Sequence, residues 1–256
     1  MELLARTRIV AWEGGSLWVV DATPNTSPEP RRTGVHAHHA IQVTIGLGGI
    51  FKLAAERFSA ETAVAVAADV DHVFEAEGLV AILFIEPESR LGRAVSRRFF
   101  GQGRLAILDT GEIADIGAGV AAAFGSPGAP DEAFIDLGRG LISRLAGQAQ
   151  AHPPDWRVRK MIGWAAENLE GRASLADVAP VVGLSSGRLS HLFAEQTGLP
   201  FRTYLLWLRL TRAVSRMAAG VAITQAAHDA GFADSAHFSR TFRRMFGVAP
   251  TNLRMT

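Results

Sequence analysis

The sequence contains no cysteine among its 256 residues. This excludes disulfide bonds and thiolate metal sites, and it leads us to expect a reducing compartment, the cytoplasm. No apolar run approaches the ~20 residues of a membrane span, and residues 1–10 carry Glu2, Arg6 and Arg8 where a signal peptide would be apolar, so we expect no membrane partner. Low-complexity tracts are also missing, and 48% hydrophobic with 20% charged residues is typical of a folded globular protein.

The net charge of +1 conceals an uneven distribution along the chain. Residues 1–154 contain 13 Arg and Lys against 18 Asp and Glu, a net charge of −5, whereas residues 155–256 contain 13 against 7, a net charge of +6. Such an asymmetry is expected when only one part of a protein meets a polyanion. The chain is also longer than a typical single domain, which favours two domains.

The first half of the sequence contains short runs of branched and aromatic residues that are typical of β-strands. The clearest runs are residues 8–12, 16–20, 41–45 and 80–85. Gly14 with Gly15, and Gly48 with Gly49, lie between such runs, and glycine supplies the positive φ angles of tight hairpins. This pattern predicts an all-β sandwich or small barrel.

Three helices are predicted after these strands, at residues 89–100, 112–124 and 131–150. The last one carries an apolar stripe at helical spacing, made of Phe134, Leu137, Leu141, Ile142 and Leu145. Such a stripe packs on its own domain or forms the seam of a homodimer, and the sequence allows both. Residues 148–154 are polar and include two prolines, so we predict a linker there, between domains at 1–147 and 155–256.

The C-terminal region contains an internal repeat. Leu175, Val178, Ala179, Gly183 and Leu184 return 48 residues later as Ile223, Ala226, Ala227, Gly231 and Phe232. In each copy a short helix ends at a glycine and a second helix begins three or four residues later. The repeat predicts helix-turn-helix units at about 174–196 and 223–246, joined by a long helix over 201–219. A generic helical bundle with coincidental similarity is the alternative.

Helical spacing separates the two faces of each predicted recognition helix. The inward residues are Leu189, Leu192 and Phe193 in the first, and Phe238, Phe242, Met245 and Phe246 in the second. The residues predicted to meet DNA are Ser186, Arg188, Ser190, His191, Ser235, Ala236, His237, Ser239, Arg240 and Arg243. Arg240 is the main candidate for a two-bonded contact with a guanine edge, its alternatives being a phosphate contact or an ion pair within the protein. Arg188 is placed to reach phosphate.

Residues 157–254 resemble the C-terminal domain of the AraC/XylS family of transcription regulators. The stretch 227–250, which reads AHDAGFADSAHFSRTFRRMFGVAP, is similar to the family signature throughout. The resemblance implies a homeodomain-like, all-α domain whose two recognition helices enter successive major-groove segments of double-stranded DNA, with RNA polymerase as a further partner. Gly187 and Pro180 depart from the family pattern in the first unit, so we expect the second unit to carry more of the sequence reading.

A second resemblance lies in the N-terminal half. Residues 36–42 read HAHHAIQ and Gly49 follows, which resembles the first cupin motif with Gln42 in the place of its Glu. His72 falls where the second cupin motif has its His, although the Pro and Gly of that motif are missing. The resemblance implies a cupin-like jelly roll with flanking dimerisation helices, which binds an effector.

Four residues form the candidate ligand set of this region: His36, His38, Gln42 and His72. They could converge and bind a divalent metal, because imidazole suits zinc, iron, nickel and copper. The alternative is that they line a pocket for a small organic effector or simply pack, which the weak Gln ligand favours, so no cofactor is predicted. His39 points to the opposite strand face from His38 and is left out of the set.

These observations predict a DNA-binding transcription regulator, not an enzyme, that responds to a small-molecule effector and acts as a homodimer. The rival function is a metal-dependent cupin enzyme with an attached helical domain. Gln42 and the lack of a nucleophile or acid–base constellation argue against that rival.

Overall fold

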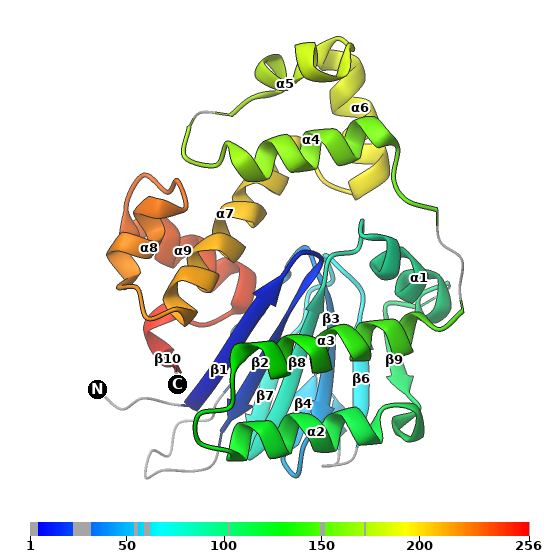
Figure 1. The fold of residues 1–256 in the computed structure, drawn as a ribbon, viewed down its shortest axis with the longest axis vertical. Coiled ribbons are helices and arrows are strands. Elements are labelled where there is room, and N and C mark those ends of the chain that lie inside the picture. The colour runs from blue at the N-terminus through cyan, green and yellow to red at the C-terminus, as the bar shows by residue number, and fades with distance from the viewer. Residues whose placement is uncertain are drawn as a thin grey trace.

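The computed structural model describes residues 5–22, 32–53, 56–58, 62–101, 103–148, 152–171 and 173–255. A β-rich N-terminal region is followed by a helical C-terminal region, in agreement with the predicted order (Figure 1). Residues 149–151 of the predicted linker lie outside the described residues.

A seven-stranded sheet forms the centre of the N-terminal region, in the order β10-β1-β2-β8-β3-β6-β9. Its first six strands along the chain are β1 (Ala5–Trp12), β2 (Gly15–Asp21), β3 (Ile41–Gly46), β6 (Ala63–Val66), β8 (Leu79–Ile85) and β9 (Leu105–Leu108). The central strand β8 is a continuous apolar run because both of its faces are covered. Leu83 and Ile85 pack toward the N-terminal helices, whereas Ile82 and Phe84 pack toward the C-terminal region.

The seventh strand comes from the end of the chain and is an addition to the predicted helical C-terminal region that the sequence did not indicate. β10 (Leu253–Met255) pairs in parallel with β1, after a short 3₁₀ turn at Pro250–Asn252. The edge of β1 would otherwise leave a row of main-chain groups unpaired, and β10 satisfies part of it. A strand of three residues carries no periodic pattern that the sequence could show.

A smaller sheet contains β4 (Ile50–Leu53), β5 (Glu56–Phe58) and β7 (Phe74–Glu77). The hairpin predicted at Gly48 and Gly49 is wrong, because β3 and β4 belong to different sheets. Gly48 has a φ of +95°, and a Cβ atom at Gly49 would lie 2.5 Å from the main-chain nitrogen of Leu79. The glycines therefore allow the chain to cross between sheets. The predicted hairpin at Gly14 is confirmed, between β1 and β2.

Three helices cover one face of the large sheet: α1 (Arg90–Phe99), α2 (Ala114–Gly125) and α3 (Asp131–Ala146) (Figure 1). The helix α3 ends short of the predicted residue 150, at Gly147 with a φ of +58°. Its apolar stripe packs within the N-terminal region, where Phe134, Leu141, Ile142 and Leu145 are buried and Leu137 contacts Gly119 of α2. The own-domain reading of the stripe is confirmed, and the stripe is not free to form a dimer seam.

The C-terminal region consists of α4 (Trp156–Glu167), α5 (Leu175–Val182), α6 (Ser186–Thr197), α7 (Phe201–Ala218), α8 (Ile223–Asp229) and α9 (Ser235–Phe246). The predicted connecting helix is confirmed as α7, which runs between the pair α5–α6 and the pair α8–α9 (Figure 1). Among the described residues, no helix is both long and apolar enough to cross a bilayer.

One hydrophobic core is shared by the large sheet and the C-terminal helices. The ring of Phe246 at the end of α9 lies 5.0 Å from that of Trp18 and 5.7 Å from that of Phe84, both on the sheet. A second core lies on the opposite face of the sheet, beneath α1, α2 and α3. The helical region is thus packed against the sheet, and its position is set by buried side chains as well as by the linker.

Candidate DNA-binding surface and the contact between the two regions

The first helix-turn-helix unit is formed by α5 and α6. Ser174 and Asp177 make a capping box at the start of α5, in which the Ser174 N–H donates to Asp177 Oδ2 at 2.9 Å. The helix continues past Pro180 and ends at Gly183, which takes the left-handed conformation (φ +70°). Ser185 then caps α6. The predicted geometry of this unit is confirmed.

The second unit is formed by α8 and α9, and its turn depends on a glycine. Gly231 has a φ of +82°, and a Cβ atom there would lie 2.2 Å from the carbonyl oxygen of Leu169. Asp234 caps α9 by accepting from the His237 N–H at 2.6 Å. The inner face of α9 is fully buried at Phe238 and Phe242, as its spacing predicts.

The residues predicted to meet DNA lie on the outer faces of α6 and α9. Those exposed to solvent are Ser186, Arg188, Ser190, His191, Ala236, Arg240 and Arg243, and those half-buried are Ser235, His237 and Ser239. The His237 ring packs 5.3 Å from the ring of Phe232. The placement of this surface follows the prediction, and its contact with DNA stays a prediction.

Among the described residues, the arginines of the recognition helix α9 differ from Arg216 of α7 in their ion pairing. Arg216 pairs with Asp229 at 2.8 Å on the side of α8. Within the described part of the chain, no ion pair or hydrogen bond engages the guanidinium of Arg240 or Arg243. Among the described residues Arg240 thus makes no ion pair, so its guanidinium is available for a phosphate or a base edge.

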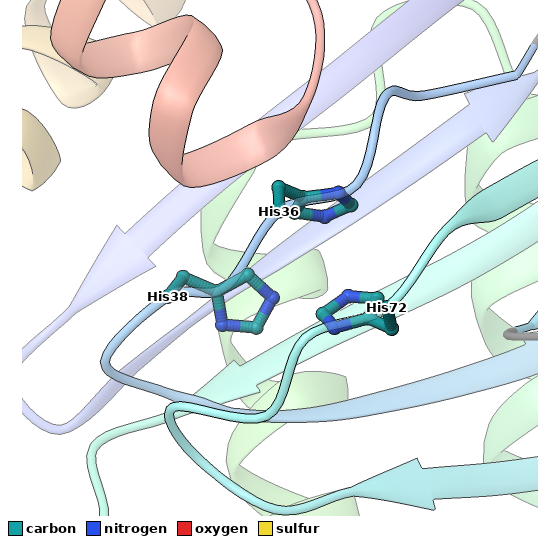
Figure 2. A group of neighbouring side chains, drawn as sticks. All are labelled: His36, His38 and His72. Carbon is teal, nitrogen blue, oxygen red and sulfur yellow. The ribbon is translucent and has the colours of Figure 1, made fainter.

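The four residues of the predicted ligand set lie together. His36, His38 and His72 each place one ring nitrogen within 4.8 Å of the other two (Figure 2). An isolated β-bridge fixes His36 opposite His72, because each N–H donates to the carbonyl of the other, at 3.0 and 2.9 Å. Gln42 Oε1 lies 3.0 Å from His38 Nε2 and 3.2 Å from His72 Nε2. We call these four residues the histidine cluster.

The main chain orients all three imidazoles. Each Nδ1 lies at hydrogen-bond distance from a carbonyl oxygen, that of Gly34, Ala40 or Val70, at 2.9, 3.1 and 2.8 Å. A carbonyl only accepts, so Nδ1 carries the proton. Burial and the neighbouring His72 lower the pKa of His36 to about 4 and that of His38 to about 3, and burial also lowers the pKa of His72. The rings are neutral near pH 7 and present Nε2 lone pairs.

His39 belongs to a separate buried network, so its exclusion from the cluster is confirmed. Its ring nitrogens lie 3.2 Å from Asp69 Oδ2 and 3.1 Å from Glu88 Oε2. Although burial alone would lower it, hydrogen bonds to Asp69 and Glu88 raise the pKa of His39 to about 9. Glu88 also accepts from the Tyr204 hydroxyl of α7 at 2.7 Å. This network joins the two regions, and sequence reasoning missed it.

The end of the second unit lies directly on the segment that carries His36. The Gly34 N–H donates to the Gly247 carbonyl at 2.8 Å, and a Cβ atom at Gly247 would lie 2.7 Å from His36 Nδ1. The Phe246 ring lies 6.1 Å from that of His38. The first unit is also attached, because Arg93 of α1 donates to the carbonyl of Gln196 in α6 at 2.7 Å.

Phe246 forms part of the wall of two cavities. The larger, about 330 Å³, is lined by β1, β2 and β8 and by α4, α7 and α9, including Trp18 and Phe84. The smaller, about 140 Å³, is lined by His36 and Gln42. Both cavities contain residues of the sheet and of the helical region in their walls.

The larger cavity has polar groups in a mostly apolar wall. The buried indole N–H of Trp207 has no hydrogen-bond partner among the described residues, which is uncommon for a buried donor. Burial, together with the charge of Glu88, raises the pKa of Glu86 to about 8, so this carboxyl is mainly protonated at pH 7. The cavity wall therefore includes one group that can donate a hydrogen bond, the protonated Glu86 carboxyl.

The second half of the chain matches known regulators. Residues 178–256 match the family described as a helix-turn-helix domain. The chain is 35% identical over 98 residues to the transcriptional activator RhaS of Pectobacterium carotovorum, covering 38% of this chain and 35% of RhaS. It is 33% identical over 118 residues to the arabinose operon regulatory protein of Escherichia coli, covering 44% and 40%. The match thus spans about two fifths or less of each relative.

The architecture as a whole is shared with a solved structure. ToxT from Vibrio cholerae O395 superposes with a TM-score of 0.59 at 17% identity, covering 94% of this chain and 96% of ToxT. ToxT from strain SCE256, in a structure with a bound unsaturated fatty acid, gives a TM-score of 0.58 at 16% identity, covering 93% and 94%. At such identity the likeness shows the fold alone. The cupin-like jelly roll stays a prediction.

Fold, site and matches together define a protein in which a β-rich region precedes tandem helix-turn-helix units. The resemblance seen in the sequence is confirmed: residues 178–256 match the helix-turn-helix domain family, and the C-terminal region is similar to that of RhaS and of the arabinose operon regulatory protein.

Proposed function

We propose that the protein is a transcription regulator that reads double-stranded DNA with α6 and α9. The observation that carries this proposal is the pair of helix-turn-helix units, each with an exposed outer face that bears a cation, Arg188 on α6 and Arg240 on α9. Recognition helices of such units enter the major groove. The helix α7 joins the units and suits them to successive groove segments of one DNA.

The test of DNA reading compares two arginines in the full chain, on a site selected from random DNA. Arg240→Ala should cost about 1–3 kcal/mol on the selected site and relax its sequence preference, because a base-edge contact is lost. Arg188→Ala should weaken all sequences alike and lower the salt slope by about one, as expected for a phosphate contact. Fluorescence anisotropy at several salt concentrations measures both quantities.

The control is Arg139→Ala, which removes an exposed cation from α3 and should leave affinity and specificity unchanged. Equal losses for the control and Arg240→Ala would reduce the effect to net charge. A reversal of the two recognition-helix variants would show that the facing assignment is wrong. Absence of sequence preference in the wild-type chain would overturn the proposed function itself.

We further propose that a small-molecule effector occupies the larger cavity and thereby changes DNA affinity. Its volume lies in the range of ligand pockets, and the smaller cavity beside the histidine cluster does not. Phe246 of the second unit forms part of its wall, so a bound molecule would contact both regions. The mostly apolar wall, with the protonated Glu86 carboxyl as a donor, suits an apolar molecule that carries an oxygen acceptor.

Two probes of nearly equal size test this chemistry. The full chain should bind 2-acetylnaphthalene more tightly than 2-ethylnaphthalene, because only the ketone accepts a hydrogen bond. Glu86→Leu should weaken binding of the ketone by about tenfold relative to the hydrocarbon, because it removes one hydrogen bond worth about 1–1.5 kcal/mol. Calorimetry measures both. Equal weakening of the two probes would contradict the assigned donor, and no effect of bound probe on DNA affinity would contradict the effector role.

A homodimer on repeated half-sites and contact with RNA polymerase complete the proposed function. A dimer would use a surface other than the stripe of α3, which is buried in the N-terminal region. Sedimentation of the full chain with and without DNA tests the dimer. Because DNA is its partner, we propose that the protein acts in the cytoplasm. The matched relatives are regulators, so we do not propose an enzyme.

A further inference from the structure

The histidine cluster brings four hydrogen-bond acceptors together, and no described residue places a donor between them. Each neutral ring has its proton on Nδ1, committed to a main-chain carbonyl, so each Nε2 is a lone pair. Gln42 Nε2 donates to Thr44 Oγ1 at 3.0 Å, which turns the amide oxygen toward the rings. We propose that His36, His38, His72 and Gln42 bind one divalent transition-metal ion.

Electrostatics supports a cation at this point. Gln42 Oε1 lies 3.0 Å from His38 Nε2 and 3.2 Å from His72 Nε2, and without a proton between them these contacts are repulsive. All four side chains are buried, with at most 5% of their surface exposed, so bulk water does not relieve the repulsion. A shared metal ion converts every one of these contacts into attraction.

The arrangement also has the supporting partners that metal-binding histidines use. Histidine ligands usually donate their second ring N–H to a carbonyl or carboxylate, which fixes the ring and raises its basicity. All three rings of the cluster do so. Three imidazoles with one amide oxygen suit zinc, cobalt, nickel or copper, whereas calcium and magnesium require mainly oxygen ligands.

A metal-free alternative exists and makes the proposal testable. If the Gln42 amide were turned over, its NH₂ group would donate to His38 Nε2 and His72 Nε2, and the Thr44 hydroxyl would donate to the oxygen. Within the described part of the chain, His36 Nε2 would still have no donor. The two arrangements differ in one measurable respect, because only the first binds a metal ion.

The position of the cluster links metal binding to the second helix-turn-helix unit. His36 Nδ1 donates to the Gly34 carbonyl at 2.9 Å, and the Gly34 N–H donates to the carbonyl of Gly247 at the end of α9. An ion bound to His36 therefore stabilises the segment on which α9 rests. This link is a property of the free protein and does not depend on DNA binding.

The first experiment titrates the chelator-treated full chain with Co²⁺ and Zn²⁺, using calorimetry and the visible absorption of bound Co²⁺. One equivalent should bind. His72→Gln should weaken binding by more than about 100-fold, because loss of even a supporting partner costs about 10–100-fold. His228→Ala, at a histidine with 85% exposure in α8, is the matched control and should bind as the wild type does.

The variant Gln42→Glu gives a result that misfolding cannot imitate, because it is expected to bind the metal ion more tightly than the wild type does. A carboxylate in place of the amide should tighten Co²⁺ binding by about tenfold or more through charge attraction. Its melting temperature should fall without metal, where the buried carboxylate is unpaired, and recover with metal. Absence of stoichiometric binding by the wild type, or binding that His72→Gln leaves intact, would overturn the proposed site.

The second experiment measures amide hydrogen exchange with and without Zn²⁺, in the absence of DNA. If local opening of the segment at Gly34 and His36 releases the ion, amide exchange at Gly34 should slow by up to about 100-fold at a free ion concentration of 100 Kd. Segment 246–250 should be protected in parallel, and the distant α2 should not. Bound metal without protection at Gly34 would overturn the link to α9. A chain that binds metal but not DNA would refute only the proposed function.

Discussion

The hydrogen bond between Tyr204 and Glu88 joins the two regions, and removing it tests how much this contact contributes to stability. The Tyr204 hydroxyl of α7 donates to Glu88 Oε1 at 2.7 Å, and the residues are 0% and 4% exposed. Burial and the charge of Glu88 raise the pKa of the Tyr204 hydroxyl, so the donor keeps its proton at neutral and mildly alkaline pH. We predict that Tyr204→Phe loosens the contact without disturbing the fold.

The magnitude follows from what the substitution removes. A hydrogen bond to a charged group contributes about 1.5–3 kcal/mol, and its loss leaves a buried carboxylate oxygen without a donor. The phenylalanine ring keeps the packing of the tyrosine ring, which lies 5.2 Å from that of Phe193. We therefore expect the free energy of unfolding to fall by about 2 kcal/mol, which corresponds to roughly 4–8 °C in melting temperature for a chain of this size.

The assay is urea unfolding of the full chain, in a double-mutant cycle with Glu88→Gln. Because Glu88→Gln weakens the same bond, Tyr204→Phe should cost much less in that background. Tyr204 is the only tyrosine in the sequence, so tyrosinate absorbance at alkaline pH reports directly on its burial. A loss below about 0.5 kcal/mol, or equal losses in both backgrounds, would refute the assigned coupling.

Two further predictions concern the same contact. The pKa of Glu86 is raised from 4.5 to about 8 in the folded protein, so the stability of the wild type relative to Glu86→Gln should fall as pH rises from about 4.5 to 8. The variant should be the more stable protein at pH 8–9, and a stability difference that is the same at every pH would contradict the raised pKa. Gly247→Ala would place a Cβ atom 2.6 Å from the Gly34 carbonyl oxygen at a φ of +71°, so it should destabilise the chain by about 1–3 kcal/mol. A substitution of similar kind at Gly163 meets no atom within 4 Å and serves as its control in thermal unfolding.

The helix-turn-helix units are the part of the fold that the sequence predicted best. Their helices are local structures, stopped by Gly183 and Gly231 and separated into faces by a period of 3.6 residues. Nothing distant is needed to decide which side of α9 is apolar. Helical spacing alone therefore places Arg240 on the exposed side of α9.

The sheet was predicted less completely, because strand pairing joins distant segments. The runs that became β1, β2, β3 and β8 were identified, but their partners were not. The glycines at 48 and 49 resemble a hairpin turn locally and serve a crossing between sheets instead. The pairing of β10 with β1 joins the two ends of the chain, and no local pattern could indicate it.

The candidate sites divide in the same way. The sequence by itself identified the two recognition helices and the four residues of the histidine cluster, because periodicity and motif spacing are local properties. Only the tertiary structure decided that His39 meets Glu88 and Tyr204, and that the end of α9 rests beside His36. Those contacts join residues far apart along the chain, and only the packing of the helical region on the sheet brings them within bonding distance.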